Sequence, residues 1–295
     1  MATNMTGTTM ATWLPEQWSS LASITYRSNT VLPALMDRRW EPEIGVGRGD
    51  TVNIPLFSQN NSARNRGAGT GTFGEATALT FDAATEQQIQ LVVNKLGYKG
   101  FSMPVEMSLQ TMPNYQSLLT DGIGKALALF TDSELANDTT NGLDAFTSVL
   151  GVDNVDVTDD VVLSAIAVLD NAIADYESRY LVVSPSTYIS LLKIERYANS
   201  LYGGSVGNLD GSKGTGYVGS IYNVDVYKSS NLQDGTAGKK NALFQKEAIA
   251  FAEQQSVKIV NDLNIEDGLL EQYVGYNVFG HVMVKDGFGN EVAGK

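Results

Sequence analysis

Two stretches in the first third of the chain alternate apolar and polar side chains, as a half-buried β-strand does. Residues 49–55 place Val52 and Ile54 between polar neighbours, and the alternation returns in residues 79–98. The sequence between them, residues 58–74, is polar and rich in glycine, with too few apolar side chains to form a core of its own. The pattern therefore predicts two strands joined by a long tip, which together make an extended hairpin arm.

Apolar side chains with helical spacing follow in the middle of the chain. Residues 113–137 repeat apolar positions at i, i+3, i+4 and i+7, which predicts a helix about 36 Å long. A second helix is predicted from an N-cap at Thr158 to Tyr176, with one apolar face whose last members are Ile173 and Tyr176. Both helices are amphipathic, so each is expected to cover a sheet or another helix with one side only.

The second half of the chain predicts strands mixed with shorter helices. A strand at residues 180–183 leads into a helix that Ser184 caps and that reaches about Tyr197. Further strands are expected at residues 218–227, 241–251, 257–260 and 272–285. The sequence shows no βαβ repetition and no internal repeat, and it therefore indicates the α+β class.

Large apolar residues without a regular pattern mark the first 40 residues, which contain all three tryptophans, Trp13, Trp18 and Trp40. Such a segment is typical of an arm that buries its anchors against another molecule. Packing across its own domain is the alternative. The sequence has neither a signal-peptide pattern nor an apolar run long enough to span a membrane, so we expect synthesis in the cytoplasm and no membrane partner.

Composition narrows the chemistry that is open to the chain. Its 295 residues include 20 Lys and Arg, 33 Asp and Glu, one His and no Cys, and the formal net charge is −13. Without cysteine there is no disulfide and no thiol nucleophile, and His281 alone cannot build a zinc site of imidazoles. The acidic balance also argues against a protein that gains affinity by neutralising phosphates. His281 lies in a strand pattern and is interpreted as a sheet residue.

No motif in the sequence indicates catalysis. The glycine-rich residues 45–49 and 67–71 lack the strand-then-helix context of a phosphate-binding loop. One group of acidic residues lacks the spacing of a calcium loop: Asp153, Asp156, Asp159 and Asp160. The last two of these suit the first turn of a helix better. We therefore expect no catalytic, cofactor-binding or metal-binding residue.

Charge is distributed unevenly along the chain. Every basic residue before Lys95 is an arginine, including Arg64 and Arg66 in the predicted hairpin tip, whereas no basic residue lies between Lys125 and Arg179. This polarity suggests that arginines of one copy meet carboxylates of another copy. The alternative is two solvated surfaces of opposite sign.

The order of these elements resembles a tailed-phage major capsid protein of the Hong Kong 97 type. The resemblance covers nearly the whole chain, and it is strongest in residues 49–55 (Gly-Asp-Thr-Val-Asn-Ile-Pro) and in residues 180–192, after an aromatic arm that carries Trp13-Leu14-Pro15-Glu16. It implies an α+β fold with five parts: an N-terminal arm (1–49), an E-loop hairpin (50–96), a P-domain with a long spine helix (97–139), an A-domain (140–254) and returning P-domain strands (255–295).

The resemblance also implies a structural, non-enzymatic role without a cofactor. Hexamers and pentamers of such a protein tile the icosahedral shell of a virion around double-stranded DNA, which is enclosed without sequence-specific binding. Assembly is expected in the host cytoplasm with a separate scaffolding protein and a portal, and with a decoration protein as an optional addition. Contacts between subunits are expected at Trp13, Trp18, Trp40, Arg64 and Arg66.

Other kinds of protein remain open at this point. An encapsulin-type nanocompartment shell shares the fold and packages protein cargo. A carboxylate-dependent enzyme or a surface adhesin would be a compact monomer with a pocket, or would carry a secretion signal. Residues 58–94 contain no lysine and the chain contains no cysteine, so we also predict a shell without covalent cross-links.

Overall fold

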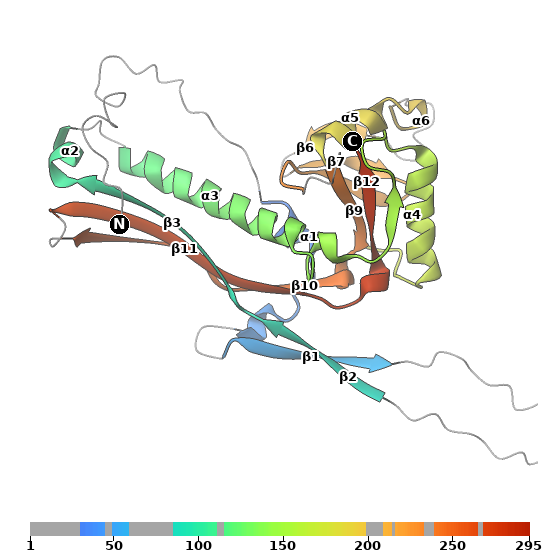
Figure 1. The fold of residues 1–295 in the computed structure, drawn as a ribbon, viewed down its shortest axis with the longest axis horizontal. Helices are drawn as coiled ribbons and strands as arrows, with labels where there is room; N and C mark the ends of the chain where they lie inside the picture. Colours follow the sequence, from blue (N-terminus) through green and yellow to red (C-terminus); the bar gives the residue numbers. More distant parts are fainter. Residues whose placement is uncertain are drawn as a thin grey trace, which may run out of the picture.

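The computed structural model describes residues 30–44, 49–58, 85–110, 115–198, 209–213, 216–232, 239–264 and 268–295. Within these ranges the strands form three sheets of two, three and seven strands. The largest sheet and its helices make a rounded domain at one end of an elongated molecule, and the other two sheets extend away from it with one long helix (Figure 1). This combination confirms the predicted α+β class.

The two-stranded sheet is the predicted hairpin. Strands β1 (Thr51–Ser58) and β2 (Thr85–Val92) pair antiparallel along their whole length. Val52 and Ile54 are buried, while Thr51, Asn53 and Pro55 beside them are exposed, as the alternation predicts. The predicted continuation of the second strand to residue 98 is wrong. The chain leaves the hairpin after Val92, and the N–H of Val93 closes the pair by donating to the carbonyl oxygen of Asp50 at 2.8 Å.

The three-stranded sheet and the long helix form one layered body. Its strands are antiparallel in the order β10 (Ile249–Asn264), β11 (Leu270–Met283) and β3 (Lys95–Pro104). Helix α3 (Tyr115–Asn137) confirms the helix predicted at 113–137 and lies so close to β11 that a side chain at Gly275 would meet Ile123. The strand predicted at 257–260 is too short. Register shifts between Glu253 and Lys258 interrupt the alternation but leave the pairing of β10 intact. The short helix α2 (Val105–Gln110) follows β3.

The seven-stranded sheet is mixed, and its two faces are covered differently. Its strands, in order across the sheet, are β4 (Val149–Gly151), β12 (Gly289–Gly294), β9 (Lys239–Gln245), β5 (Arg179–Val183), β8 (Val224–Lys228), β7 (Tyr217–Ile221) and β6 (Leu209–Lys213). On β5, Leu181 and Val183 pack into a cluster with α4 (Asp159–Asn171) and α5 (Pro185–Leu192), whereas Val182 joins a second cluster with the end of α3. The last strand, β12, lies in this sheet and not beside β10 and β11.

Helix α4 ends five residues earlier than predicted. Ile173 adopts a left-handed conformation with φ 58°, and the N–H groups of Ile173 and Ala174 donate to Asp170 and Leu169, which is a Schellman ending. Ile173 and Tyr176, predicted on the apolar face, are therefore 80% and 67% exposed. Thr158 occupies the N-cap position as predicted, but its side chain makes no capping hydrogen bond.

The other predicted boundaries differ in similar ways. The hydroxyl of Ser184 accepts from the N–H of Thr187, which confirms the predicted cap, but the helix stops at Leu192 and a separate helix α6 follows (Glu195–Ala198). The strand predicted at 218–227 is two strands, because Tyr222 and Asn223 both have positive φ and turn the chain back. A 3₁₀ turn, η4 (Lys246–Ala248), likewise divides the strand predicted at 241–251 into β9 and β10. In the described residues, no helix is long and apolar enough to cross a bilayer.

Candidate functional site

The N-terminal segment docks where the three-stranded sheet meets the rounded domain. It contains helix α1 (Leu32–Leu35) and the 3₁₀ turn η1 (Glu41–Ile44). Leu32, Leu35 and Met36 are buried in one cluster with apolar side chains of α3, β10 and β11. The backbone continues this contact, since the N–H of Asp37 donates to Ile249 at 3.1 Å and the N–H of Phe251 donates to Asp37 at 2.9 Å. We call residues 31–44, with the side chains that they touch, the arm junction.

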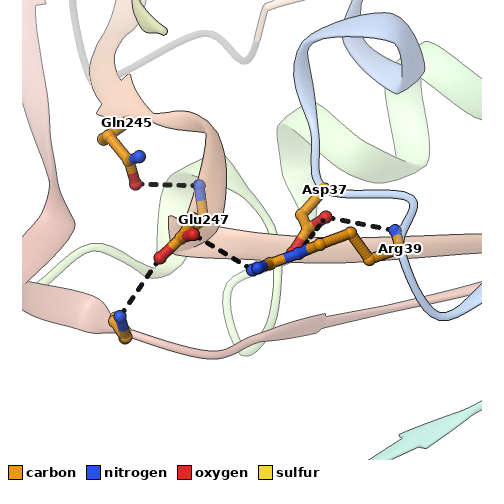
Figure 2. Close-up of polar contacts among 5 residues, drawn as sticks. Asp37, Arg39, Gln245 and Glu247 are labelled. Carbon is orange, nitrogen blue, oxygen red and sulfur yellow. Dashed lines mark hydrogen bonds and ion pairs between the residues drawn. The ribbon is translucent and has the colours of Figure 1, made fainter. Parts of the chain in front are cut away.

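A network of ion pairs between charged side chains lies at the surface of the arm junction. Figure 2 shows Arg39 between Asp37 and Glu247, with an ion pair to each carboxylate at 2.7 and 3.1 Å. Glu247 also pairs with Lys285 at 3.3 Å, and its N–H donates to the side-chain oxygen of Gln245 at 2.9 Å. The hydrogen bond that the guanidinium of Arg39 donates to the carboxylate of Asp37 raises the pKa of Arg39. Segments about 200 residues apart in sequence are thereby joined at one place.

Beneath the same segment lies a buried carboxylate on α3. Asp132 is 0% exposed and accepts hydrogen bonds from the N–H groups of Val31, at 3.0 Å, and Leu32, at 3.2 Å. The side-chain amide of Asn231 donates a third hydrogen bond at 3.4 Å. Burial raises the pKa of Asp132 to about 6, although these hydrogen bonds lower it.

The root of the hairpin is fixed on the other side of the arm junction. Ile44, Val52 and Leu91 share a buried cluster with the start of β10, and Trp40 packs against this cluster while remaining partly exposed. The chain crosses β11 at Gly280, where a side-chain carbon would lie only 2.2 Å from the carbonyl oxygen of Val92. This close approach leaves room for glycine alone and sets the place at which the hairpin leaves the body.

The single histidine of the chain lies at the end of α3. His281 is buried on β11, as predicted for a sheet residue, and its Nε2 is 3.1 Å from a carboxylate oxygen of Asp138. Burial lowers the pKa of His281 despite the nearby carboxylate. Burial also opposes ionisation of Asp138, but two backbone N–H groups, His281 and Lys95 together lower its pKa. Lys95 pairs with Glu134 at 2.9 Å, so β3, β11 and α3 are joined here by polar contacts.

The face of the three-stranded sheet that points away from α3 exposes several apolar side chains, together with charged ones at Lys258 and Asp262. Leu96 and Tyr98 on β3 are 59% and 74% exposed, and Val260 on β10 and Val274 on β11 are 44% and 37% exposed. The register places Tyr98 beside Tyr276 and Val260 beside Val274 on this side. A sheet in water normally turns polar side chains to its exposed face, so this one is suited to contact with another protein surface.

The structure describes one of the five predicted contact residues, Trp40, which packs on its own chain with part of its surface free. The other four, Trp13, Trp18, Arg64 and Arg66, lie outside the described residues. The arginines that are described in this half, at positions 38 and 39, pair within the chain. Contact of the predicted residues with a second copy therefore stays a prediction.

Two of the acidic residues weighed for calcium, Asp156 and Asp159, bind different groups of side chains of the protein itself. Asp156 accepts from Ser190 at 2.9 Å and pairs with Lys193 at 3.1 Å. Asp159 pairs with Arg196 at 2.6 Å and also accepts from the hydroxyl groups of Tyr197 and Tyr222. No group of three metal-ligating side chains occurs in the part of the chain that the structure describes.

The sequence pattern does not reveal the roles of Asp132 and Gly280. The predicted helix has one apolar stripe, and Asp132 lies off that stripe. The segment that buries Asp132 is about 100 residues away in sequence, so the helical pattern does not indicate that Asp132 is buried. Gly280 lies in an ordinary strand pattern, and only the crossing backbone shows why it is glycine.

Comparison with known proteins gives a consistent result. A family model described as "Phage capsid protein" matches residues 105–283. No curated protein sequence matches significantly. Among solved structures, the chain is similar to one titled "Mycobacterium phage Che8" (TM-score 0.69, 20% identity, 95% of this chain and 97% of that one). It is also similar to the capsid of cyanophage P-SCSP1u (TM-score 0.67, 14% identity, 97% and 94%). A third match is the capsid of an empty GTA particle (TM-score 0.61, 9% identity, 99% and 99%).

Proposed function

We propose a role that proceeds from one premise: this chain belongs to the phage capsid protein family. It is a major capsid subunit with the Hong Kong 97-type fold, a structural component of the virion and not an enzyme. Beyond this, the proposal is that copies of the chain assemble as hexamers and pentamers into a closed icosahedral shell around double-stranded DNA. Assembly takes place in the host cytoplasm with a separate scaffolding protein and a portal.

The observation that carries the proposal is the hairpin of β1 and β2. These strands pair only with each other in the described residues, and the hairpin packs on the rest of the chain at its root. An isolated two-stranded hairpin is at best marginally stable in water. A hairpin that extends from the body therefore gains stability when neighbouring copies cover it, as they do in a closed shell.

Two further properties support a shell that encloses DNA. The exposed apolar face formed by Leu96, Tyr98, Val260 and Val274 offers a surface for a neighbouring subunit. The net charge of −13 keeps the protein from binding phosphates tightly, so packaged duplex remains free to move. An encapsulin-type shell, an enzyme and an adhesin are not favoured, because the family match is to phage capsid proteins.

Electron microscopy and light scattering of the full-length protein, alone and co-expressed with a scaffolding protein, test the proposal. We expect capsomers or closed shells. A stable monomer under every condition, including high concentration and the presence of a scaffold, would contradict it. Shells that purify with protein cargo and never with DNA would instead indicate a nanocompartment.

A further inference from the structure

Asp132 joins three parts of the chain that are far apart in sequence. It lies on α3, and its carboxylate accepts from Val31 and Leu32 at the start of the arm junction and from Asn231 after β8. All of these donors are neutral. The carboxylate therefore acts as a cap for α1 that is supplied by a different helix, and it is fully covered while the N-terminal segment is docked.

No cation balances this buried carboxylate among the described residues. The basic side chains of these segments pair with other carboxylates: Lys95 with Glu134, His281 with Asp138, and Arg39 with Asp37. Lys228, just before the segment that contains Asn231, holds its ammonium group over the ring of Tyr188 at 5.4 Å. Residues 30–35 contain no titratable side chain. Burying a charge that no cation balances is unfavourable, and here burial outweighs the three hydrogen bonds, so the ionised form of Asp132 opposes the docking that covers it.

We propose that Asp132 is a pH-responsive latch, which holds residues 31–35 on α3 more tightly when its carboxyl group is protonated than when it is ionised. Undocking exposes the carboxyl group to water, where the ionised form is favoured. The docked state therefore binds the proton more tightly than the undocked state, and by linkage acid favours docking. At neutral pH the segment is docked against the charge of Asp132, so its docking is weaker there than in acid.

The size of the effect follows from the two protonation equilibria. With a carboxyl pKa of about 6 in the docked state and 3.8 when solvated, docking becomes about tenfold more favourable between pH 8 and pH 5. The latch belongs to the fold of the subunit, so it can be measured whether or not the chain forms shells. Its failure would leave the proposed function untouched.

Hydrogen exchange of the full-length protein, read by mass spectrometry, tests the latch. Exchange times are scaled for the pH dependence of intrinsic exchange, and a peptide that covers residues 31–35 is compared with one from β9. We expect the protection of the first peptide to rise about tenfold from pH 8 to pH 5, with no matching change in β9. Unchanged or falling protection in acid, or an equal change in both peptides, would overturn the proposal.

Two variants separate Asp132 from other groups that titrate in this range. Asp132→Asn keeps the shape of the side chain and does not ionise, so its protection should be independent of pH and at least equal to that of the wild type at pH 5. His281→Asn should keep the tenfold change. A tenfold change that persists in Asp132→Asn, or that vanishes in His281→Asn, contradicts the latch. Should Asp132→Asn not fold, the wild-type and His281→Asn profiles decide the question.

Discussion

Replacing Gly280 with alanine should loosen the root of the hairpin. The added carbon would lie 2.2 Å from the carbonyl oxygen of Val92, and 2.8 Å from the carbonyl carbon of Val92 and the Cα of Val93. Carbon atoms in a packed interior are normally about 3.5–4.0 Å apart. All three obstacles are backbone atoms, so no side chain can rotate away and the crossing strand itself must shift.

The magnitude follows from two opposing effects. Overpacking a filled site costs about 1–3 kcal/mol, and contact with backbone places Gly280→Ala in the upper part of this range. Removing glycine from a strand recovers about 0.5–1 kcal/mol, because the unfolded chain loses freedom. We therefore expect a net loss of about 1–2 kcal/mol in the free energy of unfolding, and a hairpin displaced from the position that assembly needs.

Urea unfolding and electron microscopy of the same preparations measure both consequences. Gly122→Ala is the matched control, because it lies in α3 with nothing within 4 Å of the added carbon. That variant should be up to about 1 kcal/mol more stable and should assemble normally. If Gly280→Ala unfolds at the same urea concentration as the wild type and forms normal shells, the crossing at β11 does not position the hairpin.

Four further outcomes are expected. Burial raises the pKa of Asp132, so the stability that protonation of Asp132 contributes is present in acid and is lost as the pH rises through about 6. Burial lowers the pKa of His281, so the stability that the neutral imidazole contributes is lost as the pH falls below 6.5. The difference in urea stability between Asp132→Asn and the wild type isolates the first effect and should grow by about 1.4 kcal/mol from pH 5 to pH 8; a constant difference would refute the assignment. Arg64→Glu combined with Arg66→Glu should weaken assembly, and high salt should weaken assembly of the wild type; assembly yields that neither change alters would exclude pairing across subunits. Deleting residues 60–74 should abolish shells and leave the thermal transition of the subunit in place, so loss of that transition would show that the tip is part of the core. Purified particles boiled in denaturant should run as one band near 31.7 kDa, whereas a ladder of oligomers would reveal covalent cross-links.

The features that the sequence predicted correctly depend on short-range interactions. The alternation around Val52 and Ile54 identified the hairpin, the helical spacing over 113–137 identified α3 to within two residues, and Ser184 marked the start of α5. Each of these patterns is complete within a few neighbouring residues, because hydrogen bonding and side-chain direction repeat locally in helices and strands. The lack of cysteine and of more than one histidine likewise removed whole classes of chemistry without a structure.

Tertiary contacts decided everything that depends on a distant partner. The chain leaves the hairpin after Val92 because β3 pairs with β11, about 180 residues later in the sequence. Asp132 is buried by a segment that no helical pattern could reveal, and Gly280 is crowded by a crossing strand. Periodicity reports which face of an element is apolar, but what covers that face is set by contacts between remote segments, and in this protein those contacts hold the arm and the hairpin.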